Sequence, residues 1–175
     1  LVAASDTHGT LADPKGIDVA ELIRLKDEGK SVLDYPRGEK GGIDAVIDVE
    51  CELWIPAARP DVINESNAGR LKTRLVLQGA NIPCTAGAER ALHQRGVLVL
   101  PDFIANAGGV ICAAMEYRGA TQQVAFATIA EKIRFNTDEV LELARGRGVL
   151  PREAATELAA RRVRQAMAHR RFGVF

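Results

Sequence analysis

The sequence predicts an α/β fold, in which a doubly wound parallel sheet is followed by helices at the C-terminal end. Short apolar runs bounded by glycine or proline alternate with longer segments of helical periodicity. This alternation is typical of parallel strands joined by right-handed crossovers. Successive runs also end in small or amide residues. Because ligands of open parallel sheets bind past the carboxyl ends of the strands, these ends predict a ligand-binding edge.

The predicted strands are short apolar runs that glycine or proline brings to an end. Pro56 and Pro101 each follow such a run, and proline has no N–H to donate to a neighbouring strand. The first run starts at Leu1 without an initiator methionine, so we expect a sheet truncated at its N-terminal strand and a chain that is a piece of a longer one. The predicted strands cover residues 1–5, 52–55, 75–78 and 97–100.

Helices are predicted where apolar residues recur at helical spacing behind a capping residue. Asp18, Thr85 and Thr121 are placed to cap helices, and Pro151 fits the first position of the last helix, where its missing N–H is not needed. Residues 34–42 are polar and rich in glycine but lack the spacing of a phosphate-binding loop, so they are predicted as an ordinary loop. The predicted helices lie within residues 18–29, 64–71, 86–95, 105–118, 121–146 and from 151 onward.

Composition argues against several classes of protein. The 175 residues are 47% hydrophobic and 26% charged, and 23 Lys+Arg balance 23 Asp+Glu, so no overall charge favours a nucleic-acid or membrane partner. No apolar run approaches the roughly 20 residues of a membrane-spanning helix. The 3 cysteines are widely spaced and odd in number. That pattern argues against a disulfide framework or a metal site and favours a reducing compartment, so we expect a cytoplasmic protein.

The last predicted helix combines an apolar stripe with many arginines. The stripe consists of Leu158, Val163 and Met167. No aromatic residues are interleaved with the arginines, and acidic residues precede them, so we interpret this surface as solvated or partner-facing, with RNA or membrane binding as the alternative. The arginines are Arg161, Arg162, Arg164, Arg170 and Arg171.

Residues 101–110 are the strongest candidate for a ligand site. They read Pro-Asp-Phe-Ile-Ala-Asn-Ala-Gly-Gly-Val and follow the predicted strand at 97–100. Paired glycines at a strand end let a ligand approach the backbone closely, although a tight strand-to-helix turn explains the same residues. His8, His93 and His169 lie far apart in the sequence, and no hydrolase triad or zinc motif is present. The sequence therefore nominates no nucleophile and no metal site.

Other predicted strands end in residues of the same character. Asp6 ends the first strand, where an acid either hydrogen-bonds the ribose of a nucleotide or serves as a turn or cap residue. Ala57 and Ala58 follow Pro56 and leave room for a flat ligand, or simply allow close packing. Gly79-Ala80-Asn81 follows the next strand.

These motifs together resemble the C-terminal, dinucleotide-binding domain of the glutamate/leucine/phenylalanine/valine dehydrogenases, most closely the glutamate dehydrogenases. The resemblance implies a partial Rossmann-like domain over residues 1–118. It also implies a helical segment over 119–175 that packs back toward an absent N-terminal substrate domain. The matching motifs cover about residues 1 to 117 in family order: Val2 to Asp6, Asp13 to Gly16, Ile55 to Ala58, Val62 to Asn64 with Asn67 and Ala68, Gly79 to Asn81 with Pro83 and Thr85, Val99 to Asp102, and Ala105 to Val110.

The family resemblance implies specific roles for these residues. Asp6 would hydrogen-bond the adenosine ribose and favour NAD, although His8 and Lys15 leave NADP open. Asn81 would contact the nicotinamide ribose or the substrate, and Asn106 would lie near the nicotinamide carboxamide. The cofactor-binding residues implied in this way are Asp6, Ala57, Ala58, Gly79, Ala80, Asn81 and Asn106.

The same resemblance implies a reaction and leaves its substrate open. The whole enzyme would oxidise an L-amino acid to a 2-oxo acid and ammonia, as a homo-oligomer that is commonly a hexamer. The family's phosphate loop and catalytic Lys and Asp lie outside this chain, so we expect no catalytic residue here and no activity from the isolated chain. The substrate pocket would include Val110 and Ala113. In the glutamate-specific members that this chain resembles, a serine at the position of Ala113 helps to hold the side-chain carboxylate. Alanine cannot donate to a carboxylate, so Ala113 favours an apolar substrate such as leucine, valine or phenylalanine.

Other residues of the chain favour glutamate as the substrate. Residues 115–117, Met-Glu-Tyr, look closer to glutamate dehydrogenases, as do the helices that follow. Family frequency also favours glutamate. Two further alternatives are a non-catalytic regulatory nucleotide-binding module and a piece that serves only as an assembly surface.

Overall fold

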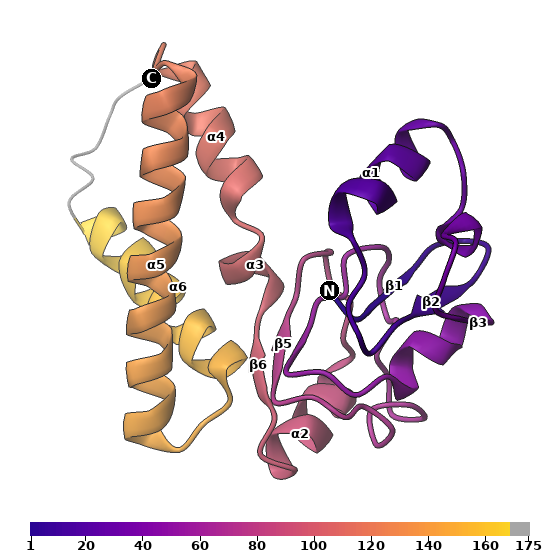
Figure 1. The fold of residues 1–175 in the computed structure, drawn as a ribbon. Coiled ribbons are helices and arrows are strands. Elements are labelled where there is room, and N and C mark those ends of the chain that lie inside the picture. The colour runs from indigo at the N-terminus through magenta and orange to yellow at the C-terminus, as the bar shows by residue number, and fades with distance from the viewer. Residues whose placement is uncertain (169–175) are drawn as a thin grey trace. The chain divides into compact units, whose positions relative to one another are not determined.

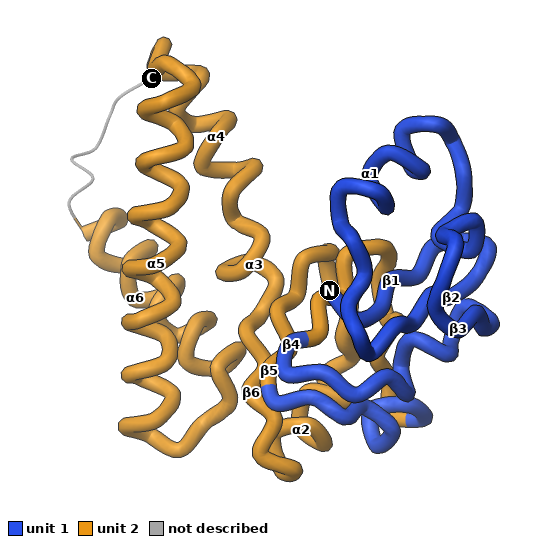
Figure 2. Tube along the Cα trace, viewed as in Figure 1, with its two compact units in different colours: residues 1–53, 66–74 blue, residues 54–65, 75–175 orange. Residues whose placement is uncertain are grey.

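The computed structural model describes residues 1–168 and divides the chain into two compact units (Figures 1 and 2). The α/β class is confirmed, because a sheet with parallel strands and a set of C-terminal helices build the second unit. Unit 1 comprises Leu1–Leu53 and Ser66–Arg74, and unit 2 comprises Trp54–Glu65 and the chain from Leu75 onward.

Unit 1 is built on an antiparallel sheet in the order β1-β2-β3. Ala4 of β1 lies opposite Leu11 of β2, and Leu11 in turn lies opposite Lys40 of β3. Leu11 is fully buried and joins the apolar residues of the helical segments in one core. The elements are β1 (Ala3–Ser5), β2 (Thr10–Ala12), α1 (Val19–Asp27), the 3-10 helix η1 (Val32–Asp34), β3 (Glu39–Gly41) and the 3-10 helix η2 (Ile43–Asp48).

Two features of unit 1 differ from the expectations from sequence. β1 pairs antiparallel with β2, because a tight turn in which the Asp6 N–H donates to the Gly9 carbonyl at 3.0 Å sends the chain back along it. The stretch 34–42, expected to be a loop, contains β3. A Cβ added at Gly9 would lie 2.5 Å from the Gly41 carbonyl oxygen, so the close approach of these segments requires glycine at position 9.

α1 begins where the sequence predicts. The Asp18 side chain accepts hydrogen bonds from the N–H groups of Ala20 and Glu21 at 2.9 and 3.3 Å, which satisfies two N–H groups that have no partner within the helix. Leu22 and Leu25 of α1 are buried. The core of unit 1 consists of Leu11, Ile17, Leu22, Leu25, Val32 and Tyr35.

Residues 65–70 form a series of turns, and the short helix predicted behind Asn64 is therefore wrong. Within this segment the Arg70 N–H donates to the Asn67 carbonyl at 2.9 Å. A helix this short has little stability of its own, so the burial of Ala68 and Leu71 decides the conformation.

The sheet of unit 2 has the order β4-β5-β6, and β5 and β6 are parallel, with Val76 opposite Val99. α2 connects these two strands, and its cap is the predicted one, because Thr85 Oγ1 accepts from the Ala88 N–H at 3.2 Å. Val76 and Val99 are buried, as predicted for a sheet covered by helices. The elements are β4 (Leu53–Trp54), β5 (Leu75–Leu77), α2 (Ala86–Gln94) and β6 (Leu98–Leu100).

The remaining residues of unit 2 are helical. The helix predicted over 105–118 is present as α4, which begins at Gly108, and a separate short helix, α3, precedes it, because the chain leaves helical hydrogen bonding at Asn106 and Ala107. Gly148 ends the long helix with a φ of 65°, a left-handed conformation that glycine adopts without strain. The helices are α3 (Asp102–Ala105), α4 (Gly108–Tyr117), α5 (Gln122–Arg147) and α6 (Pro151–Ala168).

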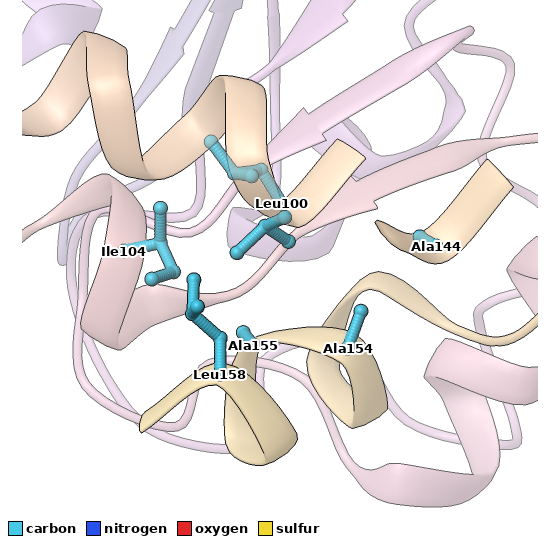
Figure 3. Close-up of a cluster of buried hydrophobic side chains, with 7 residues drawn as sticks. Leu100, Ile104, Ala144, Ala154, Ala155 and Leu158 are labelled. Atoms are coloured by element: carbon cyan, nitrogen blue, oxygen red, sulfur yellow. The ribbon is translucent and has the colours of Figure 1, made fainter. Parts of the chain in front are cut away.

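One apolar core joins the sheet of unit 2 to its C-terminal helices (Figure 3). Leu100 of β6 and Ile104 of α3 meet Leu158 of α6, and α5 contributes two further side chains. The apolar stripe predicted on α6 is wrong in its second half, because Val163 and Met167 are 57% and 64% exposed. The buried residues of this core are Leu100, Ile104, Val140, Ala144, Ala154, Ala155 and Leu158.

Arg161, Arg162 and Arg164 of α6 lie on its surface, as predicted. Arg162 bonds to the Asn136 side chain at 2.8 Å and forms an ion pair with Glu139, both on α5. Arg170, Arg171 and His169 lie outside the described residues. Among residues 1–168, no helix is both long and apolar enough to cross a membrane.

Candidate functional site

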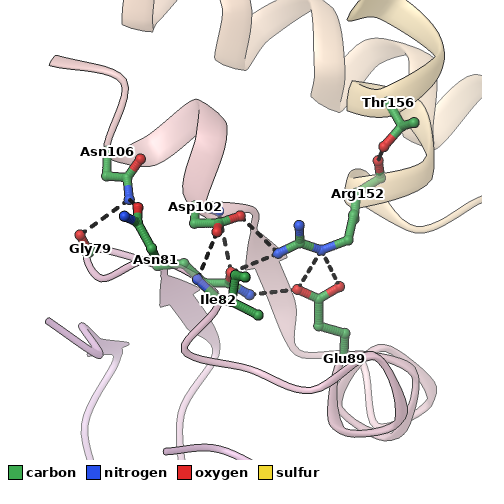
Figure 4. A network of polar contacts seen from close by, with 9 residues as sticks. Gly79, Asn81, Ile82, Glu89, Asp102, Asn106, Arg152 and Thr156 are labelled. Atoms are coloured by element: carbon green, nitrogen blue, oxygen red, sulfur yellow. Dashed lines mark hydrogen bonds and ion pairs between the residues drawn. The ribbon is translucent and has the colours of Figure 1, made fainter. Parts of the chain in front are cut away.

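Three of the predicted site residues meet where β5 and β6 end (Figure 4). The Asn106 side-chain amide donates to Asn81 Oδ1 at 2.8 Å and to the Gly79 carbonyl at 3.4 Å. Asn106 follows α3 and Asn81 follows β5, so the parallel strands bring together residues 25 positions apart. A primary amide has two donor hydrogens and one acceptor oxygen. The pair therefore keeps both an acceptor and a donor for a ligand.

The chain after β4 lies against the chain after β5. The Pro56 carbonyl accepts hydrogen bonds from the N–H groups of Gly79 and Ala80 at 3.1 and 2.8 Å. A Cβ added at Gly79 would lie 3.5 Å from the Ala57 Cβ. Ala57 and Ala58 are both exposed. The ends of β4 and β5 thus carry small residues, of which Ala57, Ala58 and Gly79 are exposed.

An open hollow of about 370 Å³ adjoins the amide pair. Its polar side is formed by Asn81, Asn106 and Asp102, and its apolar side by Phe103, Ala107 and Val110. Phe103 is 41% exposed and Val110 is 78% exposed, so both present apolar surface to whatever occupies the hollow. Ala113, the other predicted pocket residue, is exposed one turn further along α4 and does not line this hollow. A hollow of this kind suits a planar ligand with a polar edge.

A buried polar network that the sequence did not reveal lies beside the pair (Figure 4). Gln78, Glu89 and Asp102 are 0%, 4% and 7% exposed, and Arg152 of α6 bonds to all three. Gln78 also donates to Glu89 at 2.6 Å and accepts from the Asp102 N–H at 3.2 Å. The only sequence signal was an acid directly after Pro101, and nothing in the pattern linked it to a residue 50 positions later.

The charges of this network set the ionisation of Asp102. Burial opposes ionisation of Asp102, but the Ile82 N–H and the Arg152 guanidinium outweigh it, so the pKa of that carboxyl lies below its ordinary value. Burial likewise opposes the charge on Arg152, but Glu89 and Asp102 outweigh burial and raise the pKa of the guanidinium. Asp102 is therefore an anion at neutral pH and an acceptor only, which excludes it as a general acid in this state.

Asp6, the predicted ribose ligand, lies in unit 1 and is already engaged there. Its Oδ1 accepts from the His8 N–H at 2.9 Å and the Ser31 hydroxyl at 3.1 Å. Its Oδ2 accepts from Lys26 Nζ at 2.8 Å and the Val32 N–H at 3.0 Å. Although burial opposes ionisation, the bond from Lys26 and the other three hold the pKa of Asp6 well below its usual range. These bonds use the full acceptor capacity of a carboxylate.

Other groups in the described residues offer no further chemistry. No group of three or more His, Cys, Asp or Glu side chains within residues 1–168 is arranged to hold a metal ion. Cys51, Cys84 and Cys112 are free thiols. Burial, together with the nearby Glu89, raises the pKa of the Cys84 thiol to about 12, so it is not a nucleophile at neutral pH.

Comparison with known proteins identifies close similarities over the whole described chain. The family model for Glutamate/Leucine/Phenylalanine/Valine dehydrogenase matches residues 1–171. The chain is 37% identical over 147 residues to a glutamate dehydrogenase of Aeropyrum pernix, which covers 81% of this chain and 35% of that protein. It is 42% identical over 117 residues to a glutamate dehydrogenase of Thermotoga maritima, which covers 67% of this chain and 28% of that protein.

Solved structures of amino-acid dehydrogenases match the fold of this chain. A hetero-hexameric glutamate dehydrogenase from Thermus thermophilus, in its Leu-bound form, matches with a TM-score of 0.82 at 25% identity over 99% of this chain and 42% of that chain. An L-tryptophan dehydrogenase from Nostoc punctiforme matches with a TM-score of 0.69 at 22% identity, over 87% of this chain and 44% of that chain. The chain thus spans less than half the length of these relatives.

Proposed function

This chain belongs to the glutamate/leucine/phenylalanine/valine dehydrogenase family, and from that premise we propose that it is the cofactor-binding part of an NAD(P)-dependent amino-acid dehydrogenase. The complete protein would oxidise an L-amino acid, glutamate first among the candidates, to a 2-oxo acid and ammonia. The observation that carries the proposal is the Asn81–Asn106 amide pair beside an open hollow at the ends of parallel strands.

The residues at this edge fit a nicotinamide dinucleotide. Asn106 has a carbonyl oxygen available to accept from the carboxamide NH₂ of the nicotinamide, and Asn81 has an NH₂ available for a ribose hydroxyl or the substrate. Ala57, Ala58, Gly79 and Ala80 would let the flat cofactor approach the backbone. When bound, the dinucleotide supplies a ring that accepts or gives hydride, and the protein's task is to orient that ring.

Asp6 is proposed as the ligand of the adenosine ribose, with one condition that its surroundings impose. Both of its oxygens already accept two hydrogen bonds each, so a ribose hydroxyl must displace one donor. Lys26 is the donor most easily displaced, because its side chain is 47% exposed and water solvates the released ammonium. The relatives include an NADP-specific glutamate dehydrogenase of Saccharolobus shibatae, so we assign NAD as the first cofactor and NADP as the second.

Two observations give different answers on the substrate. The relatives named above as glutamate dehydrogenases favour glutamate. Val110 and Ala113 are apolar and offer no donor to a side-chain carboxylate, which favours leucine, valine or phenylalanine. We rank glutamate first because the sequence similarity covers the greater part of the chain.

The proposal extends to organisation and location. Residues 1–118 would form the dinucleotide-binding part, and the helices from residue 119 would pack toward a substrate domain elsewhere in the complete protein. Assembly as a homo-oligomer, commonly a hexamer, is part of the proposal, and the hetero-hexameric relative from Thermus supports an oligomer without deciding whether its subunits are identical. Free thiols at all three cysteines agree with a cytoplasmic location.

The test is a substrate panel on the complete protein. Glutamate, leucine, valine and phenylalanine are each supplied with NAD and then with NADP, and formation of the reduced cofactor is followed. Turnover with glutamate supports the proposal as ranked, and turnover with an apolar amino acid alone assigns Val110 and Ala113 the decisive role. A folded protein that binds dinucleotide but turns over none of the panel would instead be a regulatory nucleotide-binding module.

A further inference from the structure

We propose that Arg152 is a positioning residue, which fixes the Asn81–Asn106 pair by holding Asp102 in place. The inference rests on the proposed function for its catalytic consequence, but its structural part is testable without any turnover. Arg152 lies in the first turn of α6, far in sequence from both asparagines. It contributes no atom to the lining of the hollow, so it acts through the residues that it holds.

Arg152 holds three buried side chains at once. Its Nε donates to the two Glu89 oxygens at 2.9 and 2.8 Å, and its Nη2 donates to Gln78 Oε1 at 2.8 Å and Asp102 Oδ1 at 3.0 Å. Its guanidinium carbon also lies 5.5 Å from the centre of the Phe103 ring, a distance typical of a cation–π contact. A planar guanidinium presents its donors in a rigid fork, so these contacts fix the partners relative to one another.

Asp102 transmits that constraint to the residue beside Asn81. Its second oxygen, Oδ2, accepts from the Ile82 N–H at 2.8 Å. Ile82 has a φ of 50°, a left-handed conformation that is strained for a β-branched residue and needs external support. The Ile82 carbonyl is held as well, by the Asp61 N–H at 2.9 Å. Because the Ile82 N–H belongs to the peptide bond that joins Ile82 to Asn81, this hydrogen bond restrains the backbone that carries the Asn81 side chain.

Asp102 also holds the other member of the pair. Its backbone carbonyl accepts from the Asn106 N–H at 2.7 Å, which closes the turn of α3 that carries Asn106. Asp102 thus contacts the backbone on both sides of the amide pair, through its side chain on one side (Figure 4) and through its carbonyl on the other.

Electrostatics make Arg152 necessary for this arrangement. Glu89 and Asp102 are almost fully buried, and Arg152 is the cation that contacts both. Without that cation, the two carboxylates would lose their counter-charge in a poorly solvated place, and Asp102 would be drawn toward protonation or toward water. Either response weakens its bond to the Ile82 N–H and releases the strained backbone beside Asn81.

The experiment compares Arg152→Gln and Arg152→Lys with Arg162→Gln in the complete protein. Arg162 is the matched control, because it also lies on α6 and pairs with a carboxylate, but on the surface. The first readout is hydrogen exchange of a peptide spanning residues 79–86, measured by mass spectrometry. We expect faster exchange at this peptide in both Arg152 variants, smaller in Arg152→Lys, and wild-type exchange in Arg162→Gln.

The second readout is steady-state kinetics with the substrate that the panel identifies. We expect kcat to fall about tenfold to a hundredfold in Arg152→Gln, because a small displacement of a positioning group has effects of that size. Arg152→Lys should recover part of kcat, whereas the KM for the dinucleotide should change little. A merely structural role would lower the melting temperature and leave kcat of the folded enzyme unchanged.

The two readouts separate failure of this inference from failure of the proposed function. Wild-type exchange at residues 79–86 in a folded Arg152→Gln protein overturns the inference, whatever the enzyme does. A wild-type protein without turnover overturns the proposed function, and the exchange comparison still decides the inference. If Arg152→Gln does not fold, Arg152→Lys decides: faster local exchange supports the inference, and unchanged exchange overturns it.

Discussion

Substitution of Asp6 by asparagine should destabilise unit 1 at neutral pH, whether or not Asp6 also binds a ribose. Asparagine keeps one acceptor oxygen and replaces the other with an NH₂ group, which is a donor. If that NH₂ group takes the place of Oδ2, it faces the Val32 N–H and the Lys26 ammonium, both of which are donors. If it takes the place of Oδ1, it faces the His8 N–H and the Ser31 hydroxyl.

The magnitude follows from the burial of these donors. In the first orientation the N–H of Val32, which is 4% exposed, loses its acceptor where water has poor access, and in the second the His8 N–H and the Ser31 hydroxyl lose theirs. A buried donor left without a partner costs about 1–3 kcal/mol, while loss of the half-exposed Lys26 ion pair costs at most about 1 kcal/mol. We therefore expect Asp6→Asn to lower the free energy of unfolding by about 2–3 kcal/mol. Lys26→Met, the control, should lower it by less than about 1 kcal/mol.

Urea denaturation followed by circular dichroism at several pH values is the assay. The pKa of Asp6 is lowered on folding, so its stabilising contribution is present above the ordinary carboxyl pKa and is lost as the pH falls below it. The difference between wild type and Asp6→Asn should be complete at neutral pH and shrink below about pH 4. A difference at neutral pH smaller than that of Lys26→Met would refute the reasoning and leave Asp6 as a ligand residue only.

Three further predictions concern the rest of the fold. Leu158→Ala should lower the free energy of unfolding by about 2–5 kcal/mol, because Leu158 is 3% exposed in the core of unit 2. Val163→Ala, on the exposed face of α6, should change that free energy by less than about 0.5 kcal/mol, and denaturation curves compare the two variants. With a thiol reagent at pH 8, Cys84 should react only after denaturation, since its pKa is raised to about 12 and it is 3% exposed. Gly148→Ala should lower the melting temperature, with a cost of about 1 kcal/mol, because alanine is strained at a φ of 65°.

The sequence predicted the elements whose signals are local. Asp18, Thr85, Thr121 and Pro151 all begin helices as expected, because a cap needs only the backbone of the next turn. The antiparallel pairing of β1 with β2 was missed, since it depends on the turn at Asp6 and on the pairing of β2 with residues 27 to 31 positions away. The start of α4 at Gly108 was placed too early in the sequence, because the paired glycines at 108 and 109 weaken a helix without marking where it begins.

The site was predictable in part. Gly79, Asn81 and Asn106 come together because parallel strands place their carboxyl ends on one edge, and that rule needs no coordinates. The network of Gln78, Glu89, Asp102 and Arg152 joins residues up to 74 positions apart, and each alone resembles an ordinary polar residue. The pairing of Arg152 with buried acids depends on how α6 packs against the rest of unit 2. The periodicity of the sequence does not specify that packing.

The most direct test of the central claim, that the strand ends of unit 2 orient a nicotinamide cofactor, is the kinetics of Asn106→Ala in the complete protein. The matched control is Asn136→Ala, the same change on α5, where Asn136 accepts a bond from Arg162. We predict that kcat/KM for the dinucleotide falls about tenfold or more in Asn106→Ala, with oligomeric state and melting temperature unchanged, because one lost hydrogen bond corresponds to about that factor. Full activity in Asn106→Ala, or a loss of assembly with kinetics intact, would contradict the account.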